Sequence, residues 1–245
     1  MTLGITYLKV VAVPLMRSPG YWVPVVLFPS LLFAFFGAGP SEDDPRIAGF
    51  LLASWSAFAV LGIGFFQFGV SIAQSREEKW TDFVRTLPAG AMPKITAQLG
   101  TAALFLVLAL GLLWILAFFL TSQSLATQQY LQLGFSLLVG MVPFLFLGVT
   151  LGFALPARVA VPIANLFYLP LSYLGGLWIP PDQLPKIIQD LGPFVPTRHL
   201  GELAWAAVLG VPPPLASIGA LGVFTVLFLA TAVFFWRRDE VSRSN

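Results

Sequence analysis

The chain has 245 residues, of which 58% are hydrophobic and only 10% are charged, and its mean hydropathy is +0.87. Soluble domains carry about 25% charged residues, so this composition leaves too little polar surface to cover a water-soluble protein. Cysteine is absent and His199 is the one histidine, which excludes disulfides, thiolate chemistry and a Cys or His metal site. The net charge of +2 argues against nucleic acid as a partner.

Residues 1–17 predict an amphipathic helix, because apolar and polar residues fall on opposite helical faces. The segment is too short and too interrupted to span a bilayer. We expect it to lie in the membrane interface, with Lys9 and Arg17 towards anionic lipid.

Six apolar runs follow, each about long enough to cross ~30 Å of hydrocarbon as a helix. They cover residues 21–37, 47–73, 95–120, 131–155, 159–178 and 215–236. The first run also fits a signal peptide, but its cleavage would leave five spans and disturb the charge pattern described next. The chain is therefore expected to be an all-α integral membrane protein with six transmembrane helices.

Lysine and arginine are distributed unevenly between the two sides of these spans. With the N-terminus in the cytoplasm, ten fall inside and only Arg46, Lys186 and Arg198 fall outside. The positive-inside rule then predicts that both termini are cytoplasmic. Between their ends the spans contain no Asp, Glu, Lys or Arg. This argues against a proton- or sodium-coupled transporter and against an ion channel with a charged filter.

Small residues and prolines recur within the spans. Gly148 and Gly152 form a GxxxG pattern in the fourth span, which is typical of close helix packing. Pro143 in the same span, and Pro162 and Pro170 in the fifth, predict local kinks.

Residues 74–88, QSREEKWTDFVRTLP, are the most charged part of the sequence and predict a short cytoplasmic helix. Ser75 is the expected N-cap, with Glu78 completing a capping box, and Pro88 ends the helix. One interpretation is a helix that lies on the lipid headgroups. The cytoplasmic location favours the other, a helix that docks a soluble partner. The residues expected to contact that partner are Glu77, Glu78, Trp80, Phe83, Val84, Arg85 and Leu87.

Residues 179–214 are expected outside, yet they are rather apolar. Two short amphipathic helices are predicted there, capped by Asp182 and Thr197. Neither helix is long enough to span, which favours an extracellular re-entrant hairpin in the outer leaflet. Its polar residues Arg198, His199 and Glu202 are interpreted as a local cluster rather than a catalytic or ligand site. The residues expected to form an outer gate are Gly175, Gly176, Pro180 and Pro181.

Two motifs resemble those of ABC-2 type permeases. The run Arg76-Glu77-Glu78-x-Trp80-Thr81, which closes with Arg85-Thr86-Leu87-Pro88, resembles the coupling helix of that family. The run Gly175-Gly176-Leu177-Trp178-Ile179-Pro180-Pro181, followed by Leu184-Pro185 and then by Pro193, Pro196, Thr197 and His199, resembles the signature after the fifth span. Trp80 departs from the family, whose members commonly carry glycine there.

The resemblance implies an exporter subunit of the daunorubicin-resistance or polysaccharide-export kind in a bacterial-type plasma (inner) membrane. Two six-span subunits would pair, either two copies of this chain or this chain and a homologous permease. Each would dock a separate ABC ATPase subunit that binds ATP and Mg. The chain itself contains no G-x-x-x-x-G-K-[ST], so no P-loop and no cofactor of its own are expected.

Aromatic and amide residues in the spans are the candidates for a substrate path. They are Trp55, Phe58, Phe65, Phe66, Gln67, Asn165, Tyr168 and Tyr173. Such a path would suit an amphipathic drug, a lipid or a glycan-like molecule, but the same aromatics would equally fit a core or a lipid-facing surface. The alternative functions are a non-transporting membrane assembly or sensor protein and an intramembrane enzyme. The enzyme would need converging reactive groups, whereas the spans offer only Ser, Thr, Gln and Asn.

Overall fold

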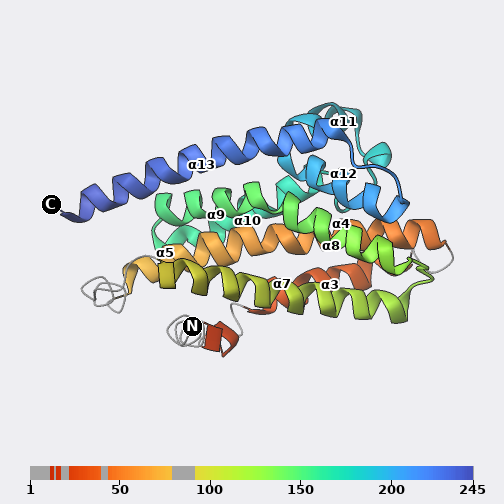
Figure 1. The fold of residues 1–245 in the computed structure, drawn as a ribbon, viewed down its shortest axis with the longest axis horizontal. Helices are drawn as coiled ribbons and strands as arrows, with labels where there is room; N and C mark the ends of the chain where they lie inside the picture. Colours follow the sequence, from red (N-terminus) through yellow and green to blue (C-terminus); the bar gives the residue numbers. More distant parts are fainter. Residues whose placement is uncertain (1–11, 14, 18–21, 40–43, 79–91, 245) are drawn as a thin grey trace.

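The computed structural model describes residues 12–13, 15–17, 22–39, 44–78 and 92–244. Within these residues the chain is helical and contains no strand. Figure 1 shows long helices that run side by side, with α5 and the last turns of α13 at one end and α11 and α12 at the other. We call these the α5 end and the α12 end. Among the described residues, five helices are long and apolar enough to cross a membrane, which confirms an all-α membrane protein.

The second expected span is the centre of the bundle. It consists of α4 (Pro45–Gly62), the π-helix η4 (Ile63–Val70) and α5 (Ser71–Glu77), which together form one continuous helix. Asp44 starts this helix, because its carboxylate accepts a hydrogen bond from the Arg46 N–H at 2.8 Å. Within the most apolar window of the helix, 89% of the residues are buried. A helix that is apolar on all sides is expected to be covered on all sides.

The first expected span, residues 21–37, is described from Trp22 onward and is helical there. Its described part consists of η1 (Val23–Leu27), α3 (Phe28–Leu32) and η2 (Phe33–Gly37), each of five residues. At about 1.5 Å per residue these segments reach roughly 22 Å, less than the ~30 Å of a hydrocarbon core. The prediction of six spans is therefore not confirmed at this segment. Most of the expected interfacial helix, residues 1–17, lies outside the described residues.

The other four spans are helices whose bounds differ from the predicted ones. They are α7 (Met92–Leu120), α8 (Thr127–Gly140) with α9 (Val142–Ala154), α10 (Ala157–Leu174), and α13 (Leu215–Ser244). The break between α8 and α9 falls at Met141, two residues before Pro143, as that proline predicts. α10 ends before Gly175, and Gly176 has a φ of 77°, a left-handed conformation that ends the helix before the predicted limit of 178.

Glycines bring α9 into backbone contact with the second span. A Cβ at Gly64 would lie 2.7 Å from the Phe144 carbonyl oxygen, and one at Gly152 would lie 2.9 Å from the Phe68 carbonyl oxygen. A Cβ at Gly148 would meet the Gly64 carbonyl oxygen. The GxxxG pattern therefore packs helices closely, as expected.

The segment after α10 contains two short helices, as predicted, with different starts. The elements are η5 (Pro181–Gln183), α11 (Lys186–Leu191), η6 (Gly192–Phe194) and α12 (Pro196–Leu209). Asp182 does not cap α11, because it lies in the separate turn η5. Thr197 does not cap α12 either: Val195 is the N-cap, and the Thr197 hydroxyl donates to the Leu171 carbonyl at 2.5 Å.

The two short helices differ in burial. The predicted apolar face of α12 is buried against α4, α8 and α13, and its members are Leu200, Leu203, Ala204, Ala207 and Val208. In α11, by contrast, Ile187 is 70% exposed and Leu191 is 48% exposed. The bundle therefore covers the second helix of the hairpin but not the first, and a re-entrant position for α11 stays a prediction.

Candidate functional site

The expected coupling helix does not begin as a separate element. Residues 74–77 are the last turn of α5, which ends at Glu77, and the backbone of Glu78 is extended with a ψ of 129°. The Ser75 hydroxyl donates to the Ile72 carbonyl at 3.1 Å, so the predicted N-cap at Ser75 is wrong. The apolar second span carries its helix through Ser75, whose side chain bonds back to the preceding turn. Trp80, Phe83, Val84, Arg85 and Leu87 lie outside the described residues.

Arg76, at the end of α5, contacts the ends of two other spans. Its Nη1 donates to the carbonyl oxygens of Gly152 at 2.7 Å, Phe153 at 3.1 Å and Leu155 at 3.4 Å. Its Nη2 forms an ion pair with the Asp239 carboxylate of α13. The last carbonyls of α9 have no partner within their own helix and carry partial negative charge, which a guanidinium satisfies.

Glu77, the next residue, contacts α10, the helix that follows α9 after a short turn. Its Oε1 accepts a hydrogen bond from the Ala157 N–H, the first residue of α10, at 2.8 Å. Helix N-termini present unpaired N–H groups and favour negative charge. Of the residues predicted to bind a partner, the described Glu77 and Glu78 thus lie at the α5 end, and Glu77 is engaged within the chain.

The structure brings most of the predicted path residues together in the core. Phe58 stacks on Tyr168 with ring centroids 4.5 Å apart, and Trp55 meets Phe58 edge-on at 5.4 Å. Phe65 and Phe66 contact Tyr168 at 6.1 Å and 5.7 Å. The Tyr168 hydroxyl donates to the Phe58 carbonyl at 3.1 Å. These rings join the second span to α10.

The remaining predicted path residues are polar or peripheral. Gln67 in η4 is fully buried, and its side-chain amide has no hydrogen-bond partner among the described residues. The Gln98 amide of α7 donates to the Gln67 backbone carbonyl at 2.5 Å. Asn165 and Tyr173 are half-buried on α10, outside the stack formed by the described rings, and Asn165 donates to Val161 of its own helix.

Of the expected outer-gate residues, Gly175 contacts α12 and Gly176 contacts the turn η5. A Cβ at Gly175 would lie 2.8 Å from the Thr197 carbonyl carbon, and one at Gly176 would lie 2.8 Å from the Pro181 ring. Pro180 and Pro181 are half-buried in the turn that follows. The glycines thus end α10 and allow a close approach; whether they also act as a gate stays a prediction.

A family model described as ABC-2 type transporter matches residues 12–209. The chain belongs to the ABC-2 type transporter family. A protein of Bacillus subtilis (strain 168) that carries the provisional name transport permease YvfS is 28% identical over 189 residues, which is 77% of this chain and 77% of that protein. No solved structure matches the chain significantly. This ABC-2 permease is therefore a multi-pass membrane subunit of a transport system.

The polar cluster of the permease's α12 lies at the end opposite Arg76. Arg198 donates to Glu202 at 2.8 Å, and the hydroxyl of Ser217 at the start of α13 donates to the other carboxylate oxygen. Burial raises the pKa of Glu202, but the hydrogen bonds from Arg198 and Ser217 and the charges of Arg198 and His199 outweigh burial, so the pKa lies below 4.5.

The contacts of His199 argue against catalysis by this cluster. Its Nε2 lies 2.9 Å from the Pro193 carbonyl and Nδ1 lies 3.3 Å from the Ser217 hydroxyl. A hydrolase triad needs the hydroxyl to face an imidazole that a carboxylate orients. Here the hydroxyl donates to the carboxylate itself and the far ring nitrogen faces a backbone carbonyl. These contacts tie α12 to α13, and the interpretation as a local polar cluster stays a prediction.

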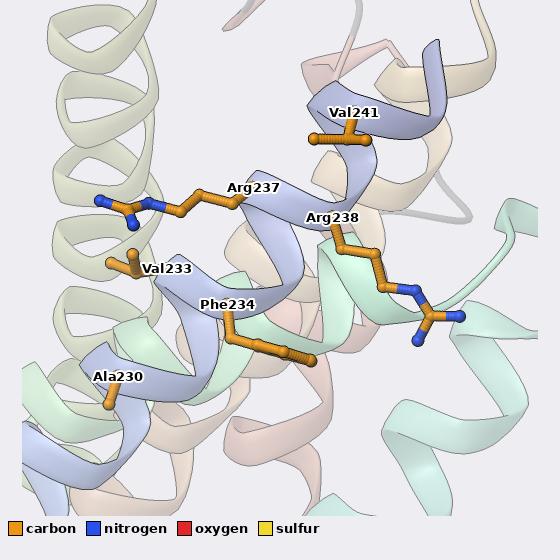
Figure 2. A pocket seen from close by; sticks show the side chains of 6 residues that line it. All are labelled: Ala230, Val233, Phe234, Arg237, Arg238 and Val241. Carbon is orange, nitrogen blue, oxygen red and sulfur yellow. The ribbon is translucent and has the colours of Figure 1, made fainter. Parts of the chain in front are cut away.

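Asp239 is a functional candidate that was not predicted from the sequence. Asp239 is a buried acid between Arg238 and Glu240 in the charged end of α13, and its position after two arginines was the available signal. Nearby, an open hollow of about 640 Å³ runs along α13. Figure 2 shows Arg237 and Arg238 leaving the helix in different directions beside it. The described residues that line it are Ala230, Val233, Phe234, Arg237, Arg238 and Val241.

Proposed function

We propose that this permease is the membrane subunit of an ATP-driven exporter. It pairs with a second copy of itself or with a homologous permease, and each subunit docks a separate ABC ATPase that binds ATP and Mg. The observation that carries the proposal is the position of the charges. In the five described spans, the ionisable residues lie at or near the helix ends, among them Arg76, Lys94, Arg158 and Asp239. Ion-coupled carriers need such groups near the bilayer midplane, so the energy comes from a partner.

The α5 end is the cytoplasmic end in this proposal. Arg76, Arg158, Arg237 and Arg238 gather there, whereas Lys186 and Arg198 belong to the α12 end. The positive-inside rule then puts both termini in the cytoplasm of a bacterial-type cell whose inner membrane holds the chain. Residues 74–88 dock the ATPase, with Trp80 and Phe83 as apolar anchors.

The substrate path is proposed to open between the second span and α10. The aromatic stack of Trp55, Phe58 and Tyr168 closes this region in the structure. The buried Gln67 amide supports an alternating path, because a buried unpaired amide costs about 1–3 kcal/mol. Parting the spans would let that amide bind water or a polar group of the substrate. A path of this character suits an amphipathic drug, a lipid or a glycan-like molecule.

The test is ATP-dependent transport by the purified complex in proteoliposomes. The panel contains an amphipathic drug, a fluorescent phospholipid and a lipid-linked glycan, with an ATPase lacking its P-loop lysine as the control. We expect one member of the panel to move and to stimulate ATP hydrolysis. Failure of the chain to co-purify with any ABC ATPase encoded beside it would contradict the proposal.

Docking has its own test in the same complex. Trp80→Ala combined with Phe83→Ala should reduce co-purification of the ATPase, since buried aromatic anchors typically contribute about 2 kcal/mol or more to binding. Phe119→Ala is the matched control, because Phe119 is 76% exposed on α7. Undiminished ATPase binding by the double variant would exclude a docking role for these aromatics.

A further inference from the structure

The end of the second span is the point where the proposed docking segment enters the bundle. α5 ends at Glu77, and Glu78 already has an extended backbone. The chain therefore passes from the docking segment into the core through a single helical turn. Any displacement of the docking segment reaches the buried second span through the residues of that turn.

Arg76 joins this turn to the fourth and sixth spans at once. Its side chain is only 15% exposed and that of Asp239 only 7%. One guanidinium holds three carbonyls at the end of α9 and the carboxylate on α13, and it lies 5.3 Å from the centre of the Phe153 ring. Such multiple, directed bonds need the planar fork of arginine, which the single ammonium of lysine does not provide.

Glu77 joins the same turn to the fifth span. α9 ends at Ala154 and α10 begins at Ala157, so a carboxyl-terminal and an amino-terminal helix end lie side by side. The first end presents carbonyls and the second presents N–H groups. The positive Arg76 binds the carbonyls at the end of α9, and the negative Glu77 binds an N–H group at the start of α10.

We propose that Arg76 and Glu77, at the start of the ATPase-docking segment, are positioning residues that transmit movement of that segment to the fourth, fifth and sixth spans. This inference rests on the proposed function and adds the route of coupling. Arg76 moves α9 and α13, and Glu77 moves α10. The backbone contacts of Gly148 and Gly152 with the second span carry the displacement further along α9.

The test is hydrogen exchange in the purified complex with and without ATP and Mg, which needs no transported substrate. In the wild type, nucleotide should change exchange at residues 150–158 and 236–241. Arg76→Lys should keep the change in α5 but reduce it at both of these segments by about fivefold or more, the lower end of typical coupling between sites. Glu77→Ala should reduce the change at residues 157–160 and leave that at residues 236–241 intact.

Arg238→Gln is the matched control, because Arg238 is an exposed cation on α13 next to Asp239, and its variant should respond like the wild type. Full responses in both Arg76→Lys and Glu77→Ala would overturn the inference while leaving the proposed function standing. A wild-type complex that binds ATP and shows no change in the permease would contradict the proposed coupling itself. Glu77 is exposed, so its variant keeps the test decisive even if Arg76→Lys folds poorly.

Discussion

The two ends of the bundle are held together in different ways. At the α12 end, separate residues make separate contacts: Trp205 donates to Ser54 at 2.7 Å, and Gln129 donates to the Val208 carbonyl at 2.6 Å. The Thr197 bond to α10 and the Glu202 cluster add further links. At the α5 end, two consecutive residues, Arg76 and Glu77, contact three other helices.

This difference indicates what each end is suited to do. When contacts are distributed over a hairpin, losing one leaves the others in place, and the region behaves as a rigid cap. When contacts converge on one helical turn, a small displacement of that turn is felt by every helix it touches. We therefore expect stability to depend mostly on the α12 end and coupling to depend on the α5 end.

The largest stability loss should follow from overpacking the α12 end. Gly175→Leu places side-chain atoms where the Thr197 side chain and backbone already lie, within 2.8 Å of a Cβ. Overpacking of this kind costs about 3 kcal/mol, so thermal unfolding in detergent should shift strongly downward. Gly222→Leu is the control, because a Cβ at Gly222 meets nothing within 4 Å. Equal unfolding temperatures for the two variants would show that this end is not a rigid cap.

The second effect compares one ion pair from each end. A double-mutant cycle with Arg76→Gln and Asp239→Asn should give a coupling energy of about 2 kcal/mol, because the pair is mostly buried. The same cycle for Lys186 and Asp190 on α11, 3.2 Å apart but 82% and 63% exposed, should give about 0.5 kcal/mol or less. A larger value for the α11 pair would reverse the order that burial predicts.

A smaller, pH-dependent effect is expected at the α12 cluster. The pKa of Glu202 is lower in the folded protein than its ordinary 4.5, because bonds and charges from Arg198, Ser217 and His199 outweigh burial. Its contribution is therefore fully present above pH 4.5 and is lost as the pH falls through the lower folded value. Because the group is partly exposed, we expect about 1 kcal/mol or less. Glu202→Gln should unfold earlier than the wild type at pH 7, and this difference should shrink as the pH falls below 4.5; a difference that stays constant with pH would contradict this.

The smallest expected effect is a difference in thiol-labelling rate between two positions of α11. The chain contains no cysteine, so single cysteines can be introduced there. Single cysteines at Ile187 and Lys186 occupy neighbouring exposed positions. If the hairpin lies in the outer leaflet, Ile187→Cys should react with a membrane-impermeant thiol reagent more slowly than Lys186→Cys. Equal rates would show that α11 is an ordinary water-exposed loop helix. Leu203 is unsuitable for this test, because α12 buries it against the bundle.

The sequence predicted what depends on local pattern. Long apolar runs predicted the second to sixth spans, Pro143 predicted a break in the fourth, and Gly148 and Gly152 predicted close packing. The predicted N-caps were wrong where tertiary contacts compete with the local capping pattern. Ser75 has the chemistry of an N-cap, but the second span extends through it, and Thr197 bonds to α10 rather than to its own helix.

The contacts at the α5 end were beyond sequence reasoning for a physical reason. Glu77 was assigned to partner docking, and Arg76 was placed in the same charged run at the start of the expected coupling helix. Their bonds to Gly152 and Ala157 depend on the turn between two helices that lie some 80 positions further along the chain. Only the packing of the bundle brings that turn to α5.

The most direct test of the account is transport measured together with ATP hydrolysis in proteoliposomes that contain the Arg76→Lys complex. The substrate is the member of the panel that the wild type moves. We predict that transport per ATP hydrolysed falls by about tenfold, while ATP hydrolysis itself stays within about twofold of the wild type. An unchanged ratio of transport to hydrolysis would show that coupling does not pass through Arg76.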